Sequence, residues 1–504
     1  MKTELMKYRI ISVILLLFIC TGLAFGQNVN LQGIDDYVNK AIKDWEVPGV
    51  AIAVVKDDKI IFAKGYGVRE LGKSDPVTPN TMFAIGSSSK AFTSAGLAML
   101  VDEGKIKWND PVSKYLPNFQ LFDPYVTREM MVQDLLSHRI GLERGDRLWY
   151  ATDYSRDEVM RRIRFLKPSS SVRSKFGYQN IMYLAGGQII PSVTGKTWDD
   201  FLKERIFAPL GMNSTNTSIS GLKGMKDVAT PHAKINDKVK PIAYRLIDNI
   251  GPAGSINSNV TDMAQWVRMQ LNNGKFGDKQ IVSAANIKEM QNPHTIIPLE
   301  GLYTSLYSEA HFLSYGMGWF LSDYRGRKMV EHGGAIDGMR AAVMMIPEEK
   351  MGVIVLGNMN GSILPQLLGN RIFDAYIFPG KEKDWSGDLL KVIKAAEAQG
   401  KAAQDKIIAD RAKDTKPSLS LESYTGNYTD EMYGDVKVTF ENGKLKAKFG
   451  TYFNGTLEHW HYDTFKVTWE DEMQGQGFIG FKLNSQGKVD AMNVEGLSEF
   501  KRTK

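Results

Sequence analysis

The stretch that decides the fold is Phe83-Ala84-Ile85-Gly86-Ser87-Ser88-Ser89-Lys90. A serine opens a helical pattern here and a lysine follows three residues later, so the hydroxyl and the amine share one face of a helix. A serine hydroxyl is a poor nucleophile without a base, and a desolvated lysine can be that base. The free backbone N–H groups at the start of a helix also favour developing negative charge. Ser87 and Lys90 are therefore a candidate catalytic pair, although S-x-x-K also occurs on ordinary solvated helix faces.

Two later segments carry polar residues of the kinds that such a pair needs. Tyr178-Gln179-Asn180 closes a polar loop and opens a helical pattern. The tyrosine can share or relay the proton of the serine, and the asparagine can bind a substrate amide. Glu331-His332-Gly333-Gly334-Ala335 ends a β-rich run, and its two glycines let a substrate lie close against strand backbone.

The order of these motifs resembles that of the serine β-lactamase and penicillin-binding-protein superfamily, in the branch with class C β-lactamases, D-peptidases and related esterases. The pattern is S-x-x-K, then Y-x-N, then K/H-x-G, and the resemblance covers roughly residues 30 to 380. Accessory stretches also match, at residues 109–117, 134–138 and 209–212.

The resemblance implies a role for each matching residue. Ser87 attacks the carbonyl and becomes acylated, while Lys90 and Tyr178 together act as the base and then protonate the leaving group. The backbone N–H groups of Ser87 and Ala335 form the oxyanion hole. No cofactor and no metal is implied. The substrate-binding residues implied are Asn180, His332, Gly333 and Gly334.

The third motif departs from that of the antibiotic-hydrolysing members, which commonly carry Lys-Thr-Gly and use the lysine to hold a substrate carboxylate. Here His332 replaces that lysine, and a histidine with its ordinary pKa near 6.5 is often neutral at pH 7. Arg340 is an alternative source of positive charge. A histidine at this place resembles D-aminopeptidase-like and esterase-like members, and whether it is catalytic or only lines the cleft stays open.

These observations predict a serine hydrolase that cleaves small amide or ester bonds, in D-amino-acid peptides or esters, through an acyl-serine intermediate. Within enzymes, the alternative is a DD-carboxypeptidase or a β-lactamase. From another class, the alternative is a penicillin- or peptidoglycan-binding sensor that is acylated without turnover.

The charge balance limits the partners that the chain can take. Its 504 residues carry a net charge of only +6, and the Lys and Arg residues are scattered among acids. No basic stripe interleaved with aromatic residues is present, so nucleic-acid binding is disfavoured. The expected partner is a small-molecule or peptide substrate, and an oligomer stays open.

The N-terminus has the pattern of a cleaved export signal. Basic residues precede an apolar stretch from Ile10 to Leu23, and Ala24-Phe25-Gly26 supplies small residues before a cut at Gln27. The stretch is short for a membrane span, so we expect export to the periplasm or outside the cell without a lasting membrane anchor. The only cysteine, Cys20, lies inside this segment, so the mature chain would carry no thiol.

The order of the predicted elements is typical of an α+β fold. β-rich runs at 50–55 and 59–63 form a hairpin, helices and loops fill residues 110–211, and β-rich runs return at 328–332, 340–346 and 351–356. Strands from both ends can therefore pair in one antiparallel sheet flanked by helices, with a helical subdomain that leaves a cleft beside it.

The expected organisation has four parts. They are a signal peptide (1–26), a β-lactamase-like hydrolase domain (27–383), a helical linker (384–417) and a small barrel-like all-β domain (418–504). The last part carries β-rich runs spaced by roughly ten residues with Gly or Asn turns between them. It resembles the lipocalin-like domain that some of these peptidases carry.

Overall fold

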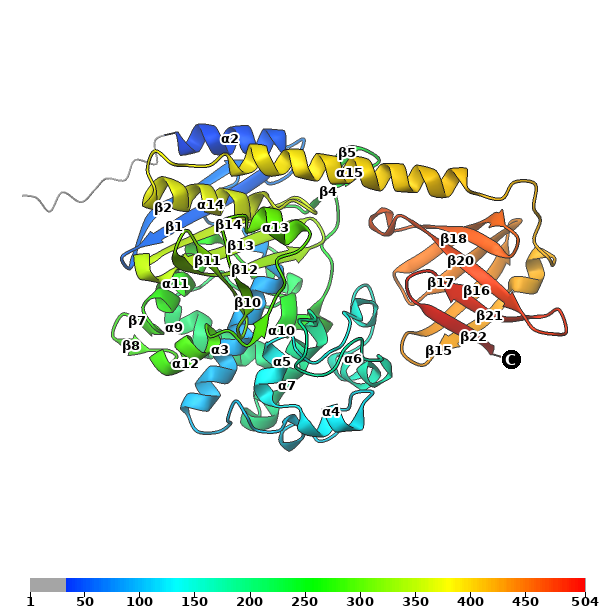
Figure 1. Cartoon of the computed structure of the whole chain (residues 1–504), viewed down its shortest axis with the longest axis horizontal. Coiled ribbons are helices and arrows are strands. Elements are labelled where there is room, and N and C mark those ends of the chain that lie inside the picture. Colours follow the sequence, from blue (N-terminus) through cyan, green and yellow to red (C-terminus); the bar gives the residue numbers. More distant parts are fainter. Residues whose placement is uncertain (1–32, 504) are drawn as a thin grey trace, which may run out of the picture.

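In the computed structural model, which describes residues 33–503, strands from both ends of the first part of the chain form one antiparallel sheet (Figure 1). The expected signal segment, with Cys20, lies outside the described residues. In spatial order the strands are β2 (Lys59–Gly67), β1 (Gly49–Lys56), β14 (Met351–Gly357), β13 (Met339–Ile346), β12 (Arg327–Ile336), β11 (Phe320–Tyr324), β10 (Leu313–Tyr315) and β9 (Thr295–Ile296).

The central strands are buried on both faces. Strand β1 pairs with β14 from the other end of the sequence, with Ile52 opposite Val355. Val50, Ile52 and Val54 belong to the core beneath α2 (Ile34–Asp44) and α14 (Leu364–Ile377), whereas Ala51, Ala53 and Val55 face the opposite core. Because helices cover both faces, the strand is continuously apolar instead of alternating. The expected pairing of strands from the two ends of the hydrolase part is confirmed.

A helical region occupies the sequence between β2 and β9, as expected. Phe92 of α3 stacks on Trp266 of α11 with ring centroids 3.9 Å apart, which fixes two of its central helices against each other. Its elements are β3 (Phe83–Ala84), the 3₁₀ turn η1 (Gly86–Ser88), α3 (Ser89–Asp102), α4 (Pro124–Glu129), α5 (Val132–Leu136), the 3₁₀ turn η3 (Asp146–Leu148), α6 (Arg156–Arg162), α7 (Asn180–Thr194), α8 (Trp198–Leu202), α9 (Ala208–Leu210), β4 (His232–Ile235), β5 (Lys238–Pro241), α10 (Gly251–Gly254), β6 (Asn257–Ser258), α11 (Val260–Leu271), β7 (Lys275–Phe276), β8 (Lys279–Gln280) and α12 (Ala284–Met290), with α13 (Leu302–Leu306) after β9.

The C-terminal part is a closed antiparallel barrel. Each strand pairs with the next in sequence, and the first closes on the last through Tyr428 opposite Arg502. The β-rich runs of the sequence indicated five of the strands but missed β18, β21 and β22. Strand β22 carries few large apolar side chains, whereas β18 buries Phe453, Leu457 and Trp460 but is interrupted by polar residues and Gly455. The strands are β15 (Gly426–Asp430), β16 (Gly434–Glu441), β17 (Lys444–Phe449), β18 (Phe453–His461), β19 (Thr464–Trp469), β20 (Gln476–Leu483), β21 (Val489–Val494) and β22 (Ser498–Thr503).

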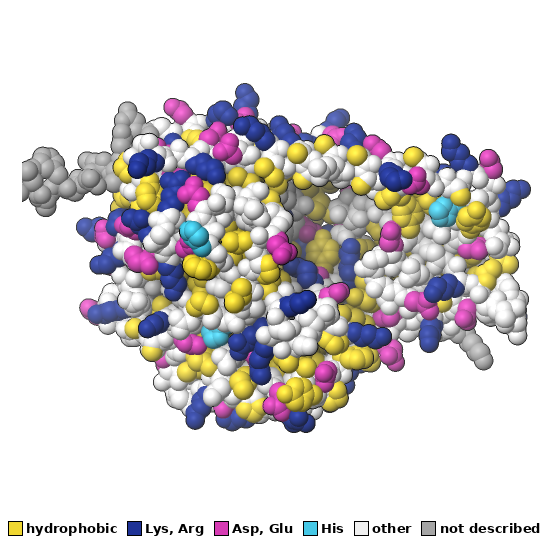
Figure 2. Space-filling model, viewed as in Figure 1, with side chains coloured by type: hydrophobic (Ala, Val, Ile, Leu, Met, Phe, Trp, Pro, Cys, Tyr) yellow, Lys and Arg dark blue, Asp and Glu magenta, His cyan; other side chains and the backbone are white. Residues whose placement is uncertain are grey.

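A single long helix, α15 (Trp385–Ala409), connects the two parts (Figure 1). Only its first turns are buried, at Trp385, Ser386 and Leu389, and most of the remainder faces solvent. Figure 2 shows a hollow under α15, between the first part and the barrel. Between residues 33 and 503, no helix combines the length and the apolar character needed to cross a membrane.

Candidate active site

Two glycines bring the serine turn directly against strand β12. Gly86 in η1 has a φ of +51°, and a Cβ at this position would lie 2.6 Å from the backbone nitrogen of Ala335. A Cβ at Gly334 would lie 1.8 Å from the carbonyl oxygen of Ile85. Only glycine permits backbones to approach this closely. The packing places partly exposed Ser87 beside Ala335, the second expected oxyanion donor.

Lys90, in the first turn of α3, is completely buried. Its Nζ lies 3.1 Å from Ser87 Oγ, 2.7 Å from Asn180 Oδ1 and 2.8 Å from the carbonyl oxygen of Ala253. Burial lowers the pKa of the amine well below its ordinary 10.5, and the positive charge of Arg144 lowers it further. Burial of the amine therefore favours its neutral form.

Asn180, the first residue of α7, is held at both ends of its amide. Its Oδ1 accepts from Lys90, and its Nδ2 donates to Asp146 Oδ1 at 2.9 Å. Asp146 also accepts from the indole nitrogen of Trp149 at 2.9 Å and pairs with Arg144 Nε at 2.5 Å. One N–H of the Asn180 amide is left for a substrate. Asn180 therefore orients Lys90, a function that the motif alone did not indicate.

Tyr178 lies over the same lysine. The centroid of its ring is 4.8 Å from Lys90 Nζ and 5.0 Å from Arg144 Cζ. Burial raises the pKa of the phenol above its ordinary value, so the hydroxyl keeps its proton at neutral pH. His138 packs against the ring with centroids 4.1 Å apart, and its Nδ1 accepts from the backbone N–H of Gln179 at 3.1 Å. This backbone contact gives His138 a structural role, because it holds the loop that carries Tyr178.

His332 is buried and neutral. Its Nδ1 lies 2.6 Å from the carbonyl oxygen of Gly333, which can only accept, so Nδ1 carries the proton. Its Nε2 then accepts from the hydroxyl of Tyr315 at 2.9 Å. Burial lowers the pKa of the imidazole to about 3. His332 therefore carries no positive charge at neutral pH, in contrast to the lysine that it replaces in the third motif.

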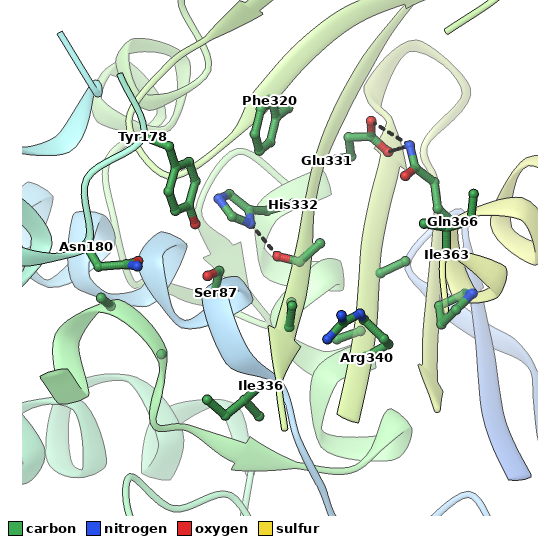
Figure 3. A pocket seen from close by; sticks show the side chains of 18 of the residues that line it. Ser87, Tyr178, Asn180, Phe320, Glu331, His332, Ile336, Arg340, Ile363 and Gln366 are labelled. Atoms are coloured by element: carbon green, nitrogen blue, oxygen red, sulfur yellow. Dashed lines mark hydrogen bonds between the residues drawn. The ribbon is translucent and has the colours of Figure 1, made fainter. Parts of the chain in front are cut away.

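Ser87, Tyr178, Asn180 and His332 line one cleft of about 330 Å³, and Lys90 lies buried beneath it. In Figure 3, Ser87, Tyr178 and Asn180 lie on one side of β12, and a second group of side chains lies on the other. That second group includes Glu331, Arg340, Ile363 and Gln366.

Arg340 is a half-buried cation without an anionic partner. Its Nη1 donates to the carbonyl oxygen of Met339 at 3.0 Å, and the guanidinium forms no ion pair within the described range. Burial lowers its pKa to about 10. Because this partly desolvated charge lines the cleft and has no partner, this end of the cleft suits an anionic group of a ligand.

Glu331 belongs to β12 and lies on the same side of that strand as Arg340, which belongs to the neighbouring strand β13. The two residues lie several residue pairs apart along the two strands. One carboxylate oxygen accepts from the hydroxyl of Tyr307 and from Gln366 Nε2, the latter at 3.2 Å. Burial raises the pKa of the carboxyl to about 7. The cleft therefore contains a carboxyl group that titrates near neutral pH.

The structure brings Ser87, Lys90, Tyr178, Asn180 and His332 together, along with the Gly333–Ala335 strand segment. Sequence reasoning missed three charged residues of the site. A charged run directly follows Gly141-Leu142 and was the available signal for two of them. The missed residues are Arg144, Asp146 and Glu331.

Comparisons with known proteins place this arrangement among serine hydrolases. A family model described as Beta-lactamase matches residues 34–371, and one described as a domain of unknown function (DUF3471) matches residues 410–503. The unguisins hydrolase ungD of Aspergillus violaceofuscus (strain CBS 115571) is 30% identical over 474 residues, covering 86% of this chain and 82% of that protein. The unguisins hydrolase ungD' of Aspergillus campestris (strain IBT 28561) is 28% identical, covering 81% of this chain and 78% of that protein.

Solved structures share the fold. The octameric penicillin-binding protein homologue from Pyrococcus abyssi superposes with a TM-score of 0.62 at 22% identity, covering 94% of this chain and 100% of that chain. A D-stereospecific amidohydrolase from Streptomyces sp. gives a TM-score of 0.55 at 19% identity, covering 68% of this chain and 98% of that chain.

Proposed function

Because this chain belongs to the Beta-lactamase family, we propose that it is an exported serine hydrolase that cleaves small amide or ester bonds through an acyl-serine intermediate. Its nucleophile is Ser87 and its base is Lys90, assisted by Tyr178. The observation that carries this proposal is the hydrogen-bonding pattern around Lys90 Nζ.

A neutral amine has two N–H donors and one lone pair. Two neighbours of Lys90 Nζ, Asn180 Oδ1 and the carbonyl oxygen of Ala253, can only accept hydrogen bonds. The third neighbour, Ser87 Oγ, can donate. The pattern accommodates a neutral amine whose lone pair points at the hydroxyl, as well as an ammonium that donates all three bonds, and burial of the side chain favours the neutral form.

The chemistry then follows in two steps. As Ser87 Oγ bonds to the substrate carbonyl carbon, its proton passes to Lys90, and the N–H groups of Ser87 and Ala335 stabilise the oxyanion. Protonated Tyr178 relays a proton to the departing amine or alcohol while the bond to it breaks. Water activated by the same lysine–tyrosine pair hydrolyses the acyl-serine and restores the hydroxyl.

The substrates that we propose are D-amino-acid peptides or esters. Support comes from the neutral His332, which lacks the charge used by antibiotic-hydrolysing members of the family. A D-stereospecific amidohydrolase and a D-amino acid amidase share the fold, and the relatives at 28% and 30% identity are named hydrolases. His332 lines the cleft and orders the strand in this proposal, without taking part in proton transfer.

The test is a substrate screen with a matched nucleophile variant. Purified protein is incubated with p-nitrophenyl esters, D- and L-amino-acid amides, D-alanyl-D-alanine and a fluorescent penicillin. We expect turnover of D-amides or esters, and Ser87→Ala should reduce it by at least about a thousandfold because no other hydroxyl replaces the nucleophile. Ser88→Ala is the control, because the Ser88 hydroxyl donates to the carbonyl oxygen of His332, away from the base. Turnover that survives in Ser87→Ala excludes Ser87 as the nucleophile.

A DD-carboxypeptidase is the second candidate, and Arg340 favours it. The free carboxylate of such a substrate would supply the anion that the half-buried guanidinium lacks. In the same screen, D-alanyl-D-alanine hydrolysed faster than D-amino-acid amides and esters selects this function. Rapid nitrocefin turnover selects a β-lactamase. An acyl adduct that persists in intact-mass spectra without release selects a sensor.

Export is supported by the N-terminal pattern of basic residues, an apolar stretch and small residues before Gln27. The proposed location is periplasmic or extracellular, where peptides with D-residues from cell walls are available as substrates.

A further inference from the structure

We propose that the C-terminal barrel positions the general base of the active site through the segment 143–154, which lies between the barrel and the cleft. The inference rests on the proposed function, because it concerns the geometry of Lys90. Asp146 and Arg147, in the middle of this segment, are positioning residues. The barrel therefore contributes to catalysis by holding the segment that positions Lys90.

Asp146 and Arg147 are consecutive in sequence but contact opposite partners. Asp146 Oδ1 accepts from Asn180 Nδ2 at 2.9 Å, and Asn180 Oδ1 accepts from Lys90 Nζ at 2.7 Å. Arg147 Nη1 donates to Gln474 Oε1 in the barrel at 3.0 Å. A continuous chain of contacts thus runs from the barrel to the amine that faces Ser87.

The position of Arg147 depends on the barrel. Its guanidinium makes a hydrogen bond with Gln474 and lies 4.7 Å from the ring centroid of Phe453, at the mouth of a barrel cavity of about 150 Å³. Burial lowers the pKa of Arg147, and it forms no ion pair within residues 33–503. Barrel residues therefore supply the main polar and aromatic partners of this side chain.

A second path joins the barrel to the oxyanion strand. Tyr150 donates to Asp337, with its hydroxyl 2.7 and 2.9 Å from the two carboxylate oxygens, and accepts from Gln474 Nε2 at 3.1 Å. Arg245 bridges Asp337, at 2.8 Å, and Asp471 of the barrel, at 2.5 Å. Asp337 directly follows the end of β12, the strand with the second oxyanion donor. The barrel turn 471–474 thus contacts supports of both halves of the proposed site.

The surface on which the barrel docks, formed by segment 143–154 and Arg162, fits the barrel closely. The hydroxyl of Tyr154 donates to the carbonyl oxygen of Tyr433 at 2.7 Å. A Cβ at Gly434, which has a φ of +88°, would lie 2.2 Å from that hydroxyl, so a side chain there would push the barrel away. Arg162 donates to the carbonyl oxygen of Met432 at 3.1 Å. These contacts fix the orientation of the barrel on segment 143–154.

Loss of this docking should loosen the base without removing it. Arg147 would lose its hydrogen-bond partner, η3 would be free to shift, and Asp146 would no longer hold the amide of Asn180 in place. The amine of Lys90 would then sample orientations away from Ser87. Because a displacement of about 1 Å in a catalytic group can cost about a hundredfold in rate, small movements here are sufficient.

The experiment compares full-length variants of the barrel turn. The double variant Asp471→Asn with Gln474→Ala removes the ion pair with Arg245 and the hydrogen bond with Arg147. It keeps the side-chain acceptor with which residue 471 caps the backbone N–H of Met473. We expect kcat/KM for an ester to fall at least tenfold, mainly in kcat, and the acid limb of its pH profile to move. Gln474→Glu keeps an acceptor for Arg147 but loses the donor to Tyr150, so its kcat/KM should lie between those of the wild type and the double variant. Glu441→Gln, in an exposed hairpin of the barrel, is the control.

Hydrogen exchange gives a readout that needs no turnover. In the double variant, peptides covering residues 143–150 should exchange faster than in the wild type and in Glu441→Gln, and Gln474→Ala alone should show the same change to a smaller extent. If no ester or amide is turned over by the wild type, the proposed function fails while exchange still tests the coupling. The inference is overturned if exchange in 143–150 is unchanged, or if kcat/KM stays within twofold with the same acid limb.

Discussion

The amine of Lys90 couples burial to reactivity, and this gives a prediction for its pH dependence. As a base, Lys90 must be neutral, so kcat/KM should rise with pH and level off above a pKa that burial holds well below 10.5. Lys90→Ala should remove this acid limb and slow acylation by about a hundredfold to ten-thousandfold, the usual range for a general base. Intact-mass measurements of acyl-enzyme formation across pH provide the test.

A lysine outside the cleft serves as the control for this prediction. Lys328 is also partly buried, and its Nζ donates to the carbonyl oxygen of Gln291 at 2.7 Å. Lys328→Ala should therefore keep the acid limb. If Lys90→Ala acylates at the wild-type rate with the same limb, another group is the base.

Glu331 should make stability depend on pH. Its pKa is raised from 4.5 to about 7 by burial, so the folded state binds the proton more tightly than the unfolded chain. The free energy of unfolding should therefore fall by up to about 3 kcal/mol as pH rises from 4.5 to 7, and stay level above that. Glu331→Gln, which is uncharged, should flatten this slope in urea melts between pH 4 and 8. An unchanged slope in the variant would assign the dependence to other groups.

At the residue scale, spacing within motifs could predict which groups meet but not their states. Ser87 and Lys90 share a helical turn, so their contact follows from local geometry. The neutral form of Lys90 depends on burial by packing that includes Asn180 and Ala253, which are 90 and 163 residues away in sequence. Arg340 is unpaired because no carboxylate of the described residues lies within ion-pair distance of its guanidinium. Such states arise only from tertiary packing, which periodicity does not encode.

At the scale of elements, the contact of η1 with β12 predicts that alanine substitutions at two adjacent glycines have very different effects. A Cβ at Gly334 would lie 1.8 Å from the carbonyl oxygen of Ile85, whereas a Cβ at Gly333 meets only Ala341 O at 3.4 Å. Gly334→Ala should lower the free energy of unfolding by about 1–3 kcal/mol through overpacking and should reduce kcat/KM at least tenfold. Gly333→Ala should keep the stability within about 1 kcal/mol of the wild type.

Urea melts and ester hydrolysis measure both effects of these glycine variants. Equal losses of stability in the two variants would show that the backbones can move apart without cost.

Elements with strong periodicity were predictable, and those defined by closure were not. The helix at α7 has a long apolar stretch, and β13 and β14 are almost entirely apolar, so each stands out in the sequence. In the barrel, β22 carries one large apolar residue, Phe500, among charged neighbours. Its place follows from pairing with β15 and β21, which is a property of the closed sheet.

At the scale of the whole molecule, the sequence indicated two folded parts and a helical connection, but not how the parts meet. The face that receives the barrel is built from a loop, residues 143–154, and from Arg245 far along the chain. Its partners are turns at the end of the barrel. Contacts between loops leave no periodic pattern of apolar residues in the sequence, so this face could not be predicted without the structure.

The helix that joins the parts also sets how they find each other. At about 1.5 Å per residue, the 25 residues of α15 reach about 37 Å, and most of that length has no packing partner. Because the barrel is covalently held, its encounter with the docking face is intramolecular and is governed by an effective concentration that the length and stiffness of the connection set. Polar contacts that are individually weak are then sufficient to keep the barrel seated, and dilution of the protein does not release it.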